Sequence, residues 1–260
     1  MKPAWYLQTA GVRPNQDYAW FPLDPAGDPD APVSVMYMEL AGGQLLRLTS
    51  PRMPSIVLAR VADGGYVLVA SRLEVPGAPD QGDYQNRPIR ATLLGVAPPG
   101  ADLDPIVSAA VAAFAGELGA ALPVRWTDGT PAIDLGAGRW PVPTSLPASS
   151  GAPLPVDGSI GLPAGAMPAV AGALAALSPG DLAAFPRDRV IALHTDTLGV
   201  DDLAQLRPWR AVSSELKEQV TFPRDRKSAR TAAVRRPGAA AGAVVLAVLV
   251  VGLLVWWLGR

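Results

Sequence analysis

An uncharged apolar run near the C-terminus, from Gly238 to Gly259, constrains this chain more than any other feature. As an α-helix rising about 1.5 Å per residue it would reach roughly 33 Å, which exceeds the roughly 30 Å hydrocarbon core of a bilayer. A buried helix of a soluble protein is the alternative, but so long a helix would need a polar face, and the run has none. The sequence therefore predicts a transmembrane helix at residues 237–260.

Charged and aromatic residues around this run predict its orientation. Basic side chains are concentrated before it and only Arg260 follows it, so the positive-inside rule places the N-terminal side in the cytoplasm. The N-terminal residues lack an apolar core of signal-peptide length. We expect a single-pass, tail-anchored protein of the cell membrane with a cytoplasmic domain. The residues expected at the lipid interfaces are Arg224, Arg226, Lys227, Arg230, Arg235, Arg236, Trp256 and Trp257.

The composition excludes several kinds of chemistry. The chain has no cysteine, which excludes disulfides, thiolate metal sites and a cysteine nucleophile. Its net charge of −1 gives no overall attraction to nucleic acid, and the basic cluster before the apolar run is better explained by anionic lipid headgroups. We find no metal-ligand or phosphate-loop spacing and expect no metal and no cofactor.

The residues before the apolar run predict an α+β fold with a mainly antiparallel sheet. Residues 1–122 are expected to form a β-rich lobe with one packed helix, which follows Pro105 and ends near Leu122. The turn Asp63-Gly64-Gly65 favours a hairpin between two of the strands. The strand-like runs are VSVMYMEL, QLLRLTS, SIVLARVA, GYVLVASRLEV and PIRATLLGVA, which begin at Val33, Gln44, Ser55, Gly65 and Pro88.

Two further folded segments and a linker are expected after this lobe. Residues 123–168 are typical of a Pro/Gly-rich connector with short strands. Residues 169–212 favour a smaller α/β part, with a helix in two pieces, the strand RVIALHT and the helix GVDDLAQL. Residues 213–236 are basic and lack an apolar face, so we expect a mobile linker between the folded domain and the membrane.

Two clusters of side chains before the connector are candidates for partner or ligand binding. The first contains the N-terminal aromatic residues, which form either a recognition surface or a cover over one end of the sheet; they are Trp5, Tyr6, Tyr18, Trp20 and Phe21. The second is a polar loop that combines carboxylate, phenol, amide and guanidinium groups, and its candidates are Asp83, Tyr84, Asn86, Arg87 and Arg90. A solvated hairpin connection is the simpler interpretation of this loop.

The only histidine, His194, and nearby Asp196 are weak catalytic candidates. They lie where a predicted strand ends before a predicted helix, which is where α/β folds bind ligands. However, the sequence offers no serine in a nucleophile elbow, no second histidine and no glycine-rich phosphate loop. A structural histidine is therefore the favoured interpretation.

Three functional hypotheses follow from these features. The favoured one is a noncatalytic adaptor or regulator, tethered to the bilayer, whose cytoplasmic domain binds a protein partner. The second is a membrane-anchored enzyme, such as a hydrolase, which predicts a pocket joining His194 and Asp196 to Asp83 or Arg87. The third is an effector that perturbs the membrane as a homo-oligomer of its apolar helix, through the small residues Gly238, Gly242 and Ala243.

Overall fold

The computed structural model describes residues 1–24, 27–28, 30–40, 43–50, 52–135 and 158–222. Residues Met1–Phe222 form one compact unit. The predicted anchor at 237–260, and the interface residues expected from Arg224 to Trp257, lie outside the described residues. Within the described ranges, no helix has the length and apolar character needed to cross a bilayer.

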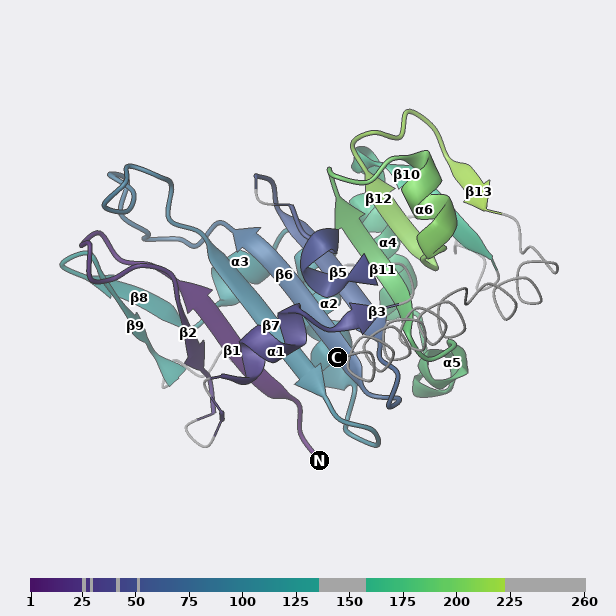
Figure 1. Cartoon of the computed structure of the whole chain (residues 1–260), viewed down its shortest axis with the longest axis horizontal. Helices are drawn as coiled ribbons and strands as arrows, with labels where there is room; N and C mark the ends of the chain where they lie inside the picture. The colour runs from purple at the N-terminus through teal and green to yellow at the C-terminus, as the bar shows by residue number, and fades with distance from the viewer. Residues whose placement is uncertain (25–26, 29, 41–42, 51, 136–157, 223–260) are drawn as a thin grey trace, which may run out of the picture. The chain divides into compact units, whose positions relative to one another are not determined.

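A nine-stranded sheet runs through this unit in the order β13-β10-β12-β11-β5-β6-β7-β1-β2 (Figure 1). Neighbouring strands are antiparallel except for the parallel pairs β10–β12 and β11–β12. The fold is thus α+β with a large, mainly antiparallel sheet, as predicted. The strands are β1 (Ala4–Thr9), β2 (Ala19–Pro22), β5 (Ser55–Arg60), β6 (Tyr66–Leu73), β7 (Ala91–Ala97), β10 (Ser159–Pro163), β11 (Arg189–Thr195), β12 (Arg210–Ser213) and β13 (Val220–Phe222).

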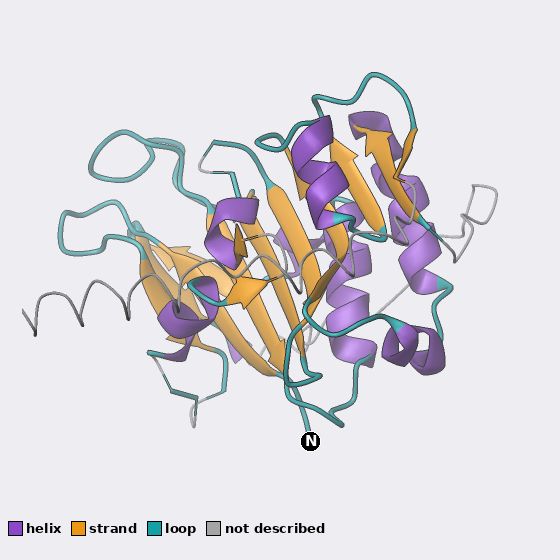
Figure 2. Cartoon of the chain, turned by 45° about the vertical axis from the view of Figure 1, so that its right-hand side comes forward, coloured by secondary structure: helices purple, strands orange, loops and turns teal. Residues whose placement is uncertain are grey.

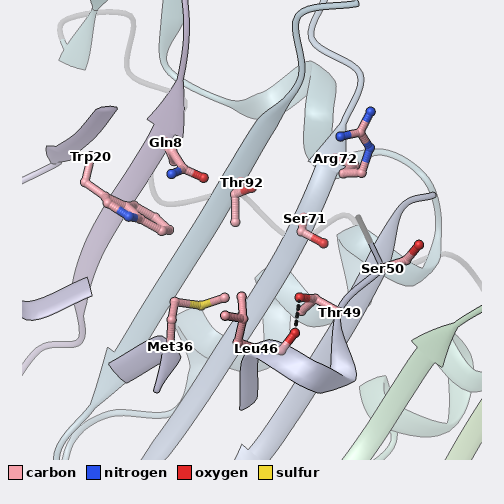
Figure 3. Close-up of a pocket in the computed structure, with 9 residues that line it drawn as sticks. All are labelled: Gln8, Trp20, Met36, Leu46, Thr49, Ser50, Ser71, Arg72 and Thr92. Carbon is pink, nitrogen blue, oxygen red and sulfur yellow. Dashed lines mark hydrogen bonds between the residues drawn. The ribbon is translucent and has the colours of Figure 1, made fainter. Parts of the chain in front are cut away.

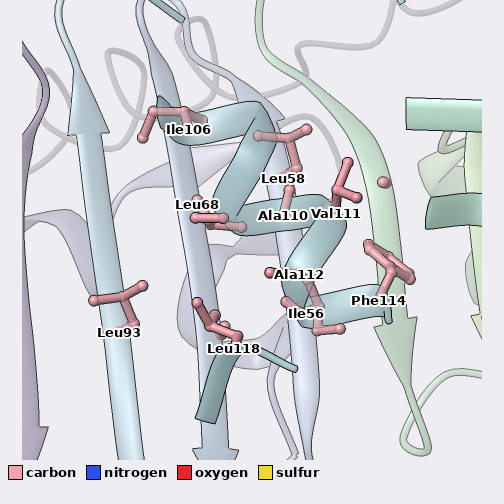
Figure 4. Packing of buried hydrophobic residues seen from close by; sticks show 14 of the residues in the cluster. Ile56, Leu58, Leu68, Leu93, Ile106, Ala110, Val111, Ala112, Phe114 and Leu118 are labelled. Atoms are coloured by element: carbon pink, nitrogen blue, oxygen red, sulfur yellow. The ribbon is translucent and has the colours of Figure 1, made fainter. Parts of the chain in front are cut away.

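One face of the sheet is covered by α2 (Asp104–Phe114), α3 (Leu118–Ala121), α4 (Met167–Ala175) and α5 (Pro179–Ala184) (Figure 2). Ile106 and Phe114 of α2 are buried against strand residues such as Leu58, and each such side chain contributes about 1.5–3 kcal/mol (Figure 4). The alanines of α2 let this helix approach the sheet closely. Gly95 on β7 has the same effect, because a Cβ there would lie 2.5 Å from the Trp5 ring.

The opposite face is covered by α1 (Ala31–Met36), the 3₁₀ helix η1 (Leu45–Leu48) and α6 (Val200–Leu206). The sheet thus has a hydrophobic core on each face, and alternate side chains of β5 pack into one or the other. Ile56 and Leu58 belong to the core on the first face, and Val57 and Ala59 to the core on the second. Burial on both faces explains why β5 and β6 are continuous apolar runs rather than alternating ones. A two-stranded pair, β3 (Glu39–Leu40) with β4 (Gly43–Gln44), lies between α1 and η1 in the chain.

Two of the five predicted strands of the first lobe are wrong. VSVMYMEL contains the end of α1 and the short β3, and QLLRLTS contains the last residue of β4 and all of η1. Pro32 fits the first turn of α1. Met36, Leu45 and Leu48 are buried over the second face, so tertiary packing overrides the strand propensity of these short runs. The other three runs form the predicted antiparallel meander β5–β6–β7, with Gly64 in its first turn at φ +96°.

The described part of the predicted connector contains short strands, and the helices and the strand predicted after it are present. β8 (Val124–Thr127) and β9 (Thr130–Ile133) form a hairpin, and SIGLP forms β10. RVIALHT is β11, which pairs with β5 of the first lobe, so the two predicted parts share one sheet. The short 3₁₀ helix η3 (Ala164–Ala166) leads into α4.

The compact unit extends further than the predicted linker boundary at residue 213. Leu216 and Phe222 are buried, and they pack on Gly161, where a Cβ would lie 2.8 Å from Leu216. Residues 213–222 therefore belong to the fold, because they carry apolar side chains that complete the second core. No helix forms in SSELKEQV, which crosses from β12 to β13.

Candidate functional site

The polar loop after β6 is held together by its own charges. Asp83 is buried, and its carboxylate accepts hydrogen bonds from Arg87 Nε at 2.7 Å and from the backbone N–H of Gln85 at 2.9 Å. Arg87 Nη2 lies 2.6 Å from the same carboxylate. Burial acts to raise the pKa of Asp83, but the hydrogen bonds from Arg87 and the backbone outweigh it and hold the pKa below its usual value. This pair is a structural clamp across the loop.

The other candidate residues of the loop also have structural roles or contacts with neighbouring residues. The Tyr84 hydroxyl lies 3.4 Å from Asp17, and Arg87 approaches Asp17 at 3.6 Å. Asn86 adopts the left-handed conformation, at φ 58°, that closes the turn. Arg90 is directed elsewhere and pairs with Glu74 at 3.0 Å. The loop thus brings Asp83, Tyr84 and Arg87 together near Asp17, and these contacts serve to dock the loop on the segment before β2.

His194 lies on β11 between Ile56 of β5 and Val212 of β12. Its side chain lines a cavity of about 310 Å³ whose wall contains none of Asp196, Asp83 or Arg87. Burial lowers the pKa of His194, and the negative charge of Asp196 opposes this shift only in part. The described residues therefore do not join the two weak catalytic candidates to the polar loop in one pocket.

A second cavity, of about 380 Å³, lies on the face of the sheet that carries α1 and η1 (Figure 3). We call it the Arg72 cleft. Its floor is a row of side chains from four neighbouring strands: Trp20 of β2, Gln8 of β1, Thr92 of β7 and Ser71 with Arg72 of β6. The register sets this row, because Gln8 is opposite both Trp20 and Thr92. Its side wall is formed by Met36, Leu46, Thr49 and Ser50.

A β-bulge presents Arg72 to this cleft. The pairing of β6 with β7 shifts between Ala70 and Leu73, so Ser71 and Arg72 together face Thr92. Arg72 has φ 57°, in the left-handed region that costs a non-glycine residue about 1–2 kcal/mol. Glycine would occupy this position at no steric cost. Backbone strain retained at a cleft is typical of functional positions.

Several side chains of the cleft have unused hydrogen-bonding groups. Among the described residues, the Arg72 guanidinium has no hydrogen bond or ion pair, and the side chains of Gln8 and Thr92 have no hydrogen bond. The indole N–H of Trp20 is likewise without a partner there. All four residues are half-buried. The cleft therefore has a cationic end at Arg72, donors along its floor, and an apolar end formed by Trp20, Met36 and Leu46.

Sequence reasoning missed most of this cleft. Trp20 belongs to the N-terminal aromatic cluster, whose members Trp5 and Tyr6 are buried in the two cores, whereas Trp20 lines the cleft. Gln8, Arg72 and Thr92 carry no local signal, because they meet only through strand pairing. A single sequence also gives no sign that a residue other than glycine stands at a β-bulge.

Comparison of the chain with protein-family models, with curated proteins and with solved structures finds no match. Within the ranges that the structure describes, no group of three or more histidine or acidic side chains is placed to hold a metal ion.

Proposed function

We propose that this protein is a noncatalytic, membrane-tethered adaptor whose Arg72 cleft binds an extended segment of a protein partner. The observation that carries the proposal is a set of groups in the cleft that have no partner in the described part of the chain: the guanidinium of Arg72, the amide of Gln8 and the hydroxyl of Thr92. In the polar loop, by contrast, the charges of Asp83 and Arg87 neutralise each other.

The length of the cleft suits a short extended peptide. From β6 to β2 the floor crosses three strand spacings of about 4.8 Å, or roughly 14 Å. An extended chain advances about 3.3 Å per residue, so about four residues span the same distance. Four such steps join five residues, so the ligand is a segment of about five residues rather than a larger folded surface.

The side chains at the two ends of the cleft determine which residues the bound peptide should contain. A carboxylate at one end pairs with Arg72, which gives a charge-assisted hydrogen bond worth about 1.5–3 kcal/mol. An apolar side chain four positions away lies on the same face of the extended chain and packs between Trp20, Met36 and Leu46. Gln8 and Thr92 supply donors and acceptors for the polar backbone between the two ends. The expected motif is an acidic residue separated from an apolar residue by three others.

The tether is part of the same proposal. Residues 237–260 anchor the chain in the cell membrane, and the basic residues before them keep the domain on the cytoplasmic side. Partner binding would then recruit that partner to the bilayer surface. The long apolar run and its one-sided positive charge support this part of the proposal.

A binding experiment with labelled peptides tests the proposal. Peptides with the pattern acidic-x-x-x-apolar are titrated by fluorescence polarisation against the full chain in lipid nanodiscs, with scrambled peptides as the reference. We expect Arg72→Gln to weaken binding at least about tenfold, since it removes the charge-assisted bond. The matched control is Arg47→Gln, the same change at an exposed arginine of η1 outside the cleft lining. Equal effects of the two substitutions, or no preference over scrambled peptides, would refute the proposal.

A further inference from the structure

The cavity beside His194 lies on the other face of the sheet from the Arg72 cleft. It is lined by the strand residues Ile56, Leu73 and His194 and by the ends of α2, α3 and α4, from which Leu118 and Met167 contribute. Gly119 of α3 lets this wall approach the sheet, since a Cβ there would lie 2.0 Å from the carbonyl oxygen of Glu74. At about 310 Å³, the cavity has about twice the volume of an engineered cavity of about 150 Å³ that binds benzene in another protein.

His194 is the polar group of this wall that is available to a ligand. Neither of its ring nitrogens has a hydrogen-bond partner among the described residues, and Nδ1 is shielded from solvent. Glu74 also lines the cavity, but its carboxylate is paired with Arg90 at 3.0 Å. Because burial lowers the pKa of His194, the ring is neutral at neutral pH and offers one N–H donor and one acceptor.

The surroundings exclude charged ligands. Among the described residues that line the cavity, none carries a positive charge that could balance an anion. A cation would lose its hydration on entering a cavity lined largely by apolar side chains, which include Ile56, Leu73, Leu118 and Met167. The carboxylate of Glu74 would not compensate for this loss, because it is already paired with Arg90. A neutral molecule with one hydrogen-bonding group avoids both costs.

We propose that this cavity is a second binding site, which takes a small neutral molecule with an apolar body and a single hydroxyl that hydrogen-bonds His194. This site goes beyond the proposed adaptor function and involves none of the residues of the Arg72 cleft. Its volume fits a two-ring aromatic alcohol.

Equilibrium dialysis with two matched probes tests this site. The probes are 2-naphthol and its methyl ether, which has the same rings but cannot donate a hydrogen bond. Each probe is measured against the full chain in lipid nanodiscs, with empty nanodiscs to subtract partition into lipid. We expect saturable binding of one naphthol per chain, and affinity for the ether at least about fivefold lower.

Variants of the protein test where the probes bind and whether they hydrogen-bond to His194. His194→Phe keeps the ring shape and removes the hydrogen bond, so we expect it to lower the affinity for naphthol to that of the ether and to leave the ether unchanged. Ala113→Val narrows the cavity and should weaken both probes, while Arg72→Gln should affect neither. Far-UV circular dichroism checks that each variant is folded. If Ala113→Val does not fold, the comparison of the two probes in His194→Phe still tests the site. Absence of saturable binding above empty nanodiscs, or equal losses for both probes in His194→Phe, would overturn the proposal.

Discussion

Replacing Arg72 by glycine should separate the stability of the fold from the binding activity of the cleft. Arg72 stands at a bulge with φ 57°, a conformation that glycine adopts freely. We expect Arg72→Gly to abolish peptide binding and to raise the free energy of unfolding.

The magnitude follows from the backbone geometry. Relief of the left-handed conformation contributes about 1–2 kcal/mol, and the greater freedom of glycine in the unfolded chain subtracts about 0.5–1 kcal/mol. The Arg72 side chain has no hydrogen bond or ion pair among the described residues, so its removal costs little else. The net stabilisation is therefore roughly 0–1.5 kcal/mol. Arg72→Ala removes the same side chain but retains the strain, and it should be less stable than Arg72→Gly by about 1 kcal/mol.

Urea unfolding of both variants, followed by circular dichroism, measures this difference as a shift in the midpoint at constant slope. Peptide binding should be lost equally in both. If Arg72→Gly proved less stable than Arg72→Ala, residue 72 would not be in the left-handed conformation, and the argument for a strained, functional bulge would fail.

Four more predictions concern the domain boundary, pH dependence and the membrane. A chain ending at Phe222 should fold stably, whereas one ending at Val212 should lose several kcal/mol in urea unfolding, because the buried side chains of Leu216 and Phe222 contribute about 1.5–3 kcal/mol each; equal stability would remove β13 from the core. Because the pKa of His194 is lowered in the folded state, the unfolded state binds more protons below about pH 6.5, and the free energy of unfolding should fall as the pH drops below that value. In His194→Phe, the plot of unfolding free energy against pH should be flatter between pH 5 and 8. In a chain ending at Arg236, glutamine at Arg224, Arg226, Lys227 and Arg230 should weaken co-sedimentation with anionic vesicles, at about 1 kcal/mol per cation, and high salt should do the same; insensitivity to both would refute the electrostatic account. A reporter fused after Arg260 should be active only on the far side of the membrane, and cytoplasmic activity would reverse the predicted orientation.

Segments with strong local signals could be predicted from the sequence. β5, β6 and β7 are continuous apolar runs separated by turn residues, and α2 begins with Asp104 and Pro105, so local physics and the final fold agree there. The single helix predicted to end near Leu122 instead ends at Phe114, and α3 follows after Gly116, which has φ 77°. α1 and η1 could not be predicted, because a short apolar run fits a strand or a helix equally well and packing on the second face decides between them.

The candidate site depended on information that no local pattern holds. The sequence identified the polar residues of the loop around Asp83, but it could not show that Arg87 would neutralise Asp83. The Arg72 cleft draws on four strands, and its floor exists only because Gln8 is aligned with both Trp20 and Thr92. A shift of one residue in either register would turn these side chains to the other face.

The pairing of β5 with β11 also dictates how the chain must fold during synthesis. β5 lies near the middle of the sheet, yet its partner is made more than a hundred residues later. At about 5–20 residues per second, the ribosome leaves the apolar edge SIVLAR unpaired for on the order of ten seconds. An open apolar strand edge is a template for aggregation, so the nascent chain is most vulnerable after β7 has formed and before β11 emerges.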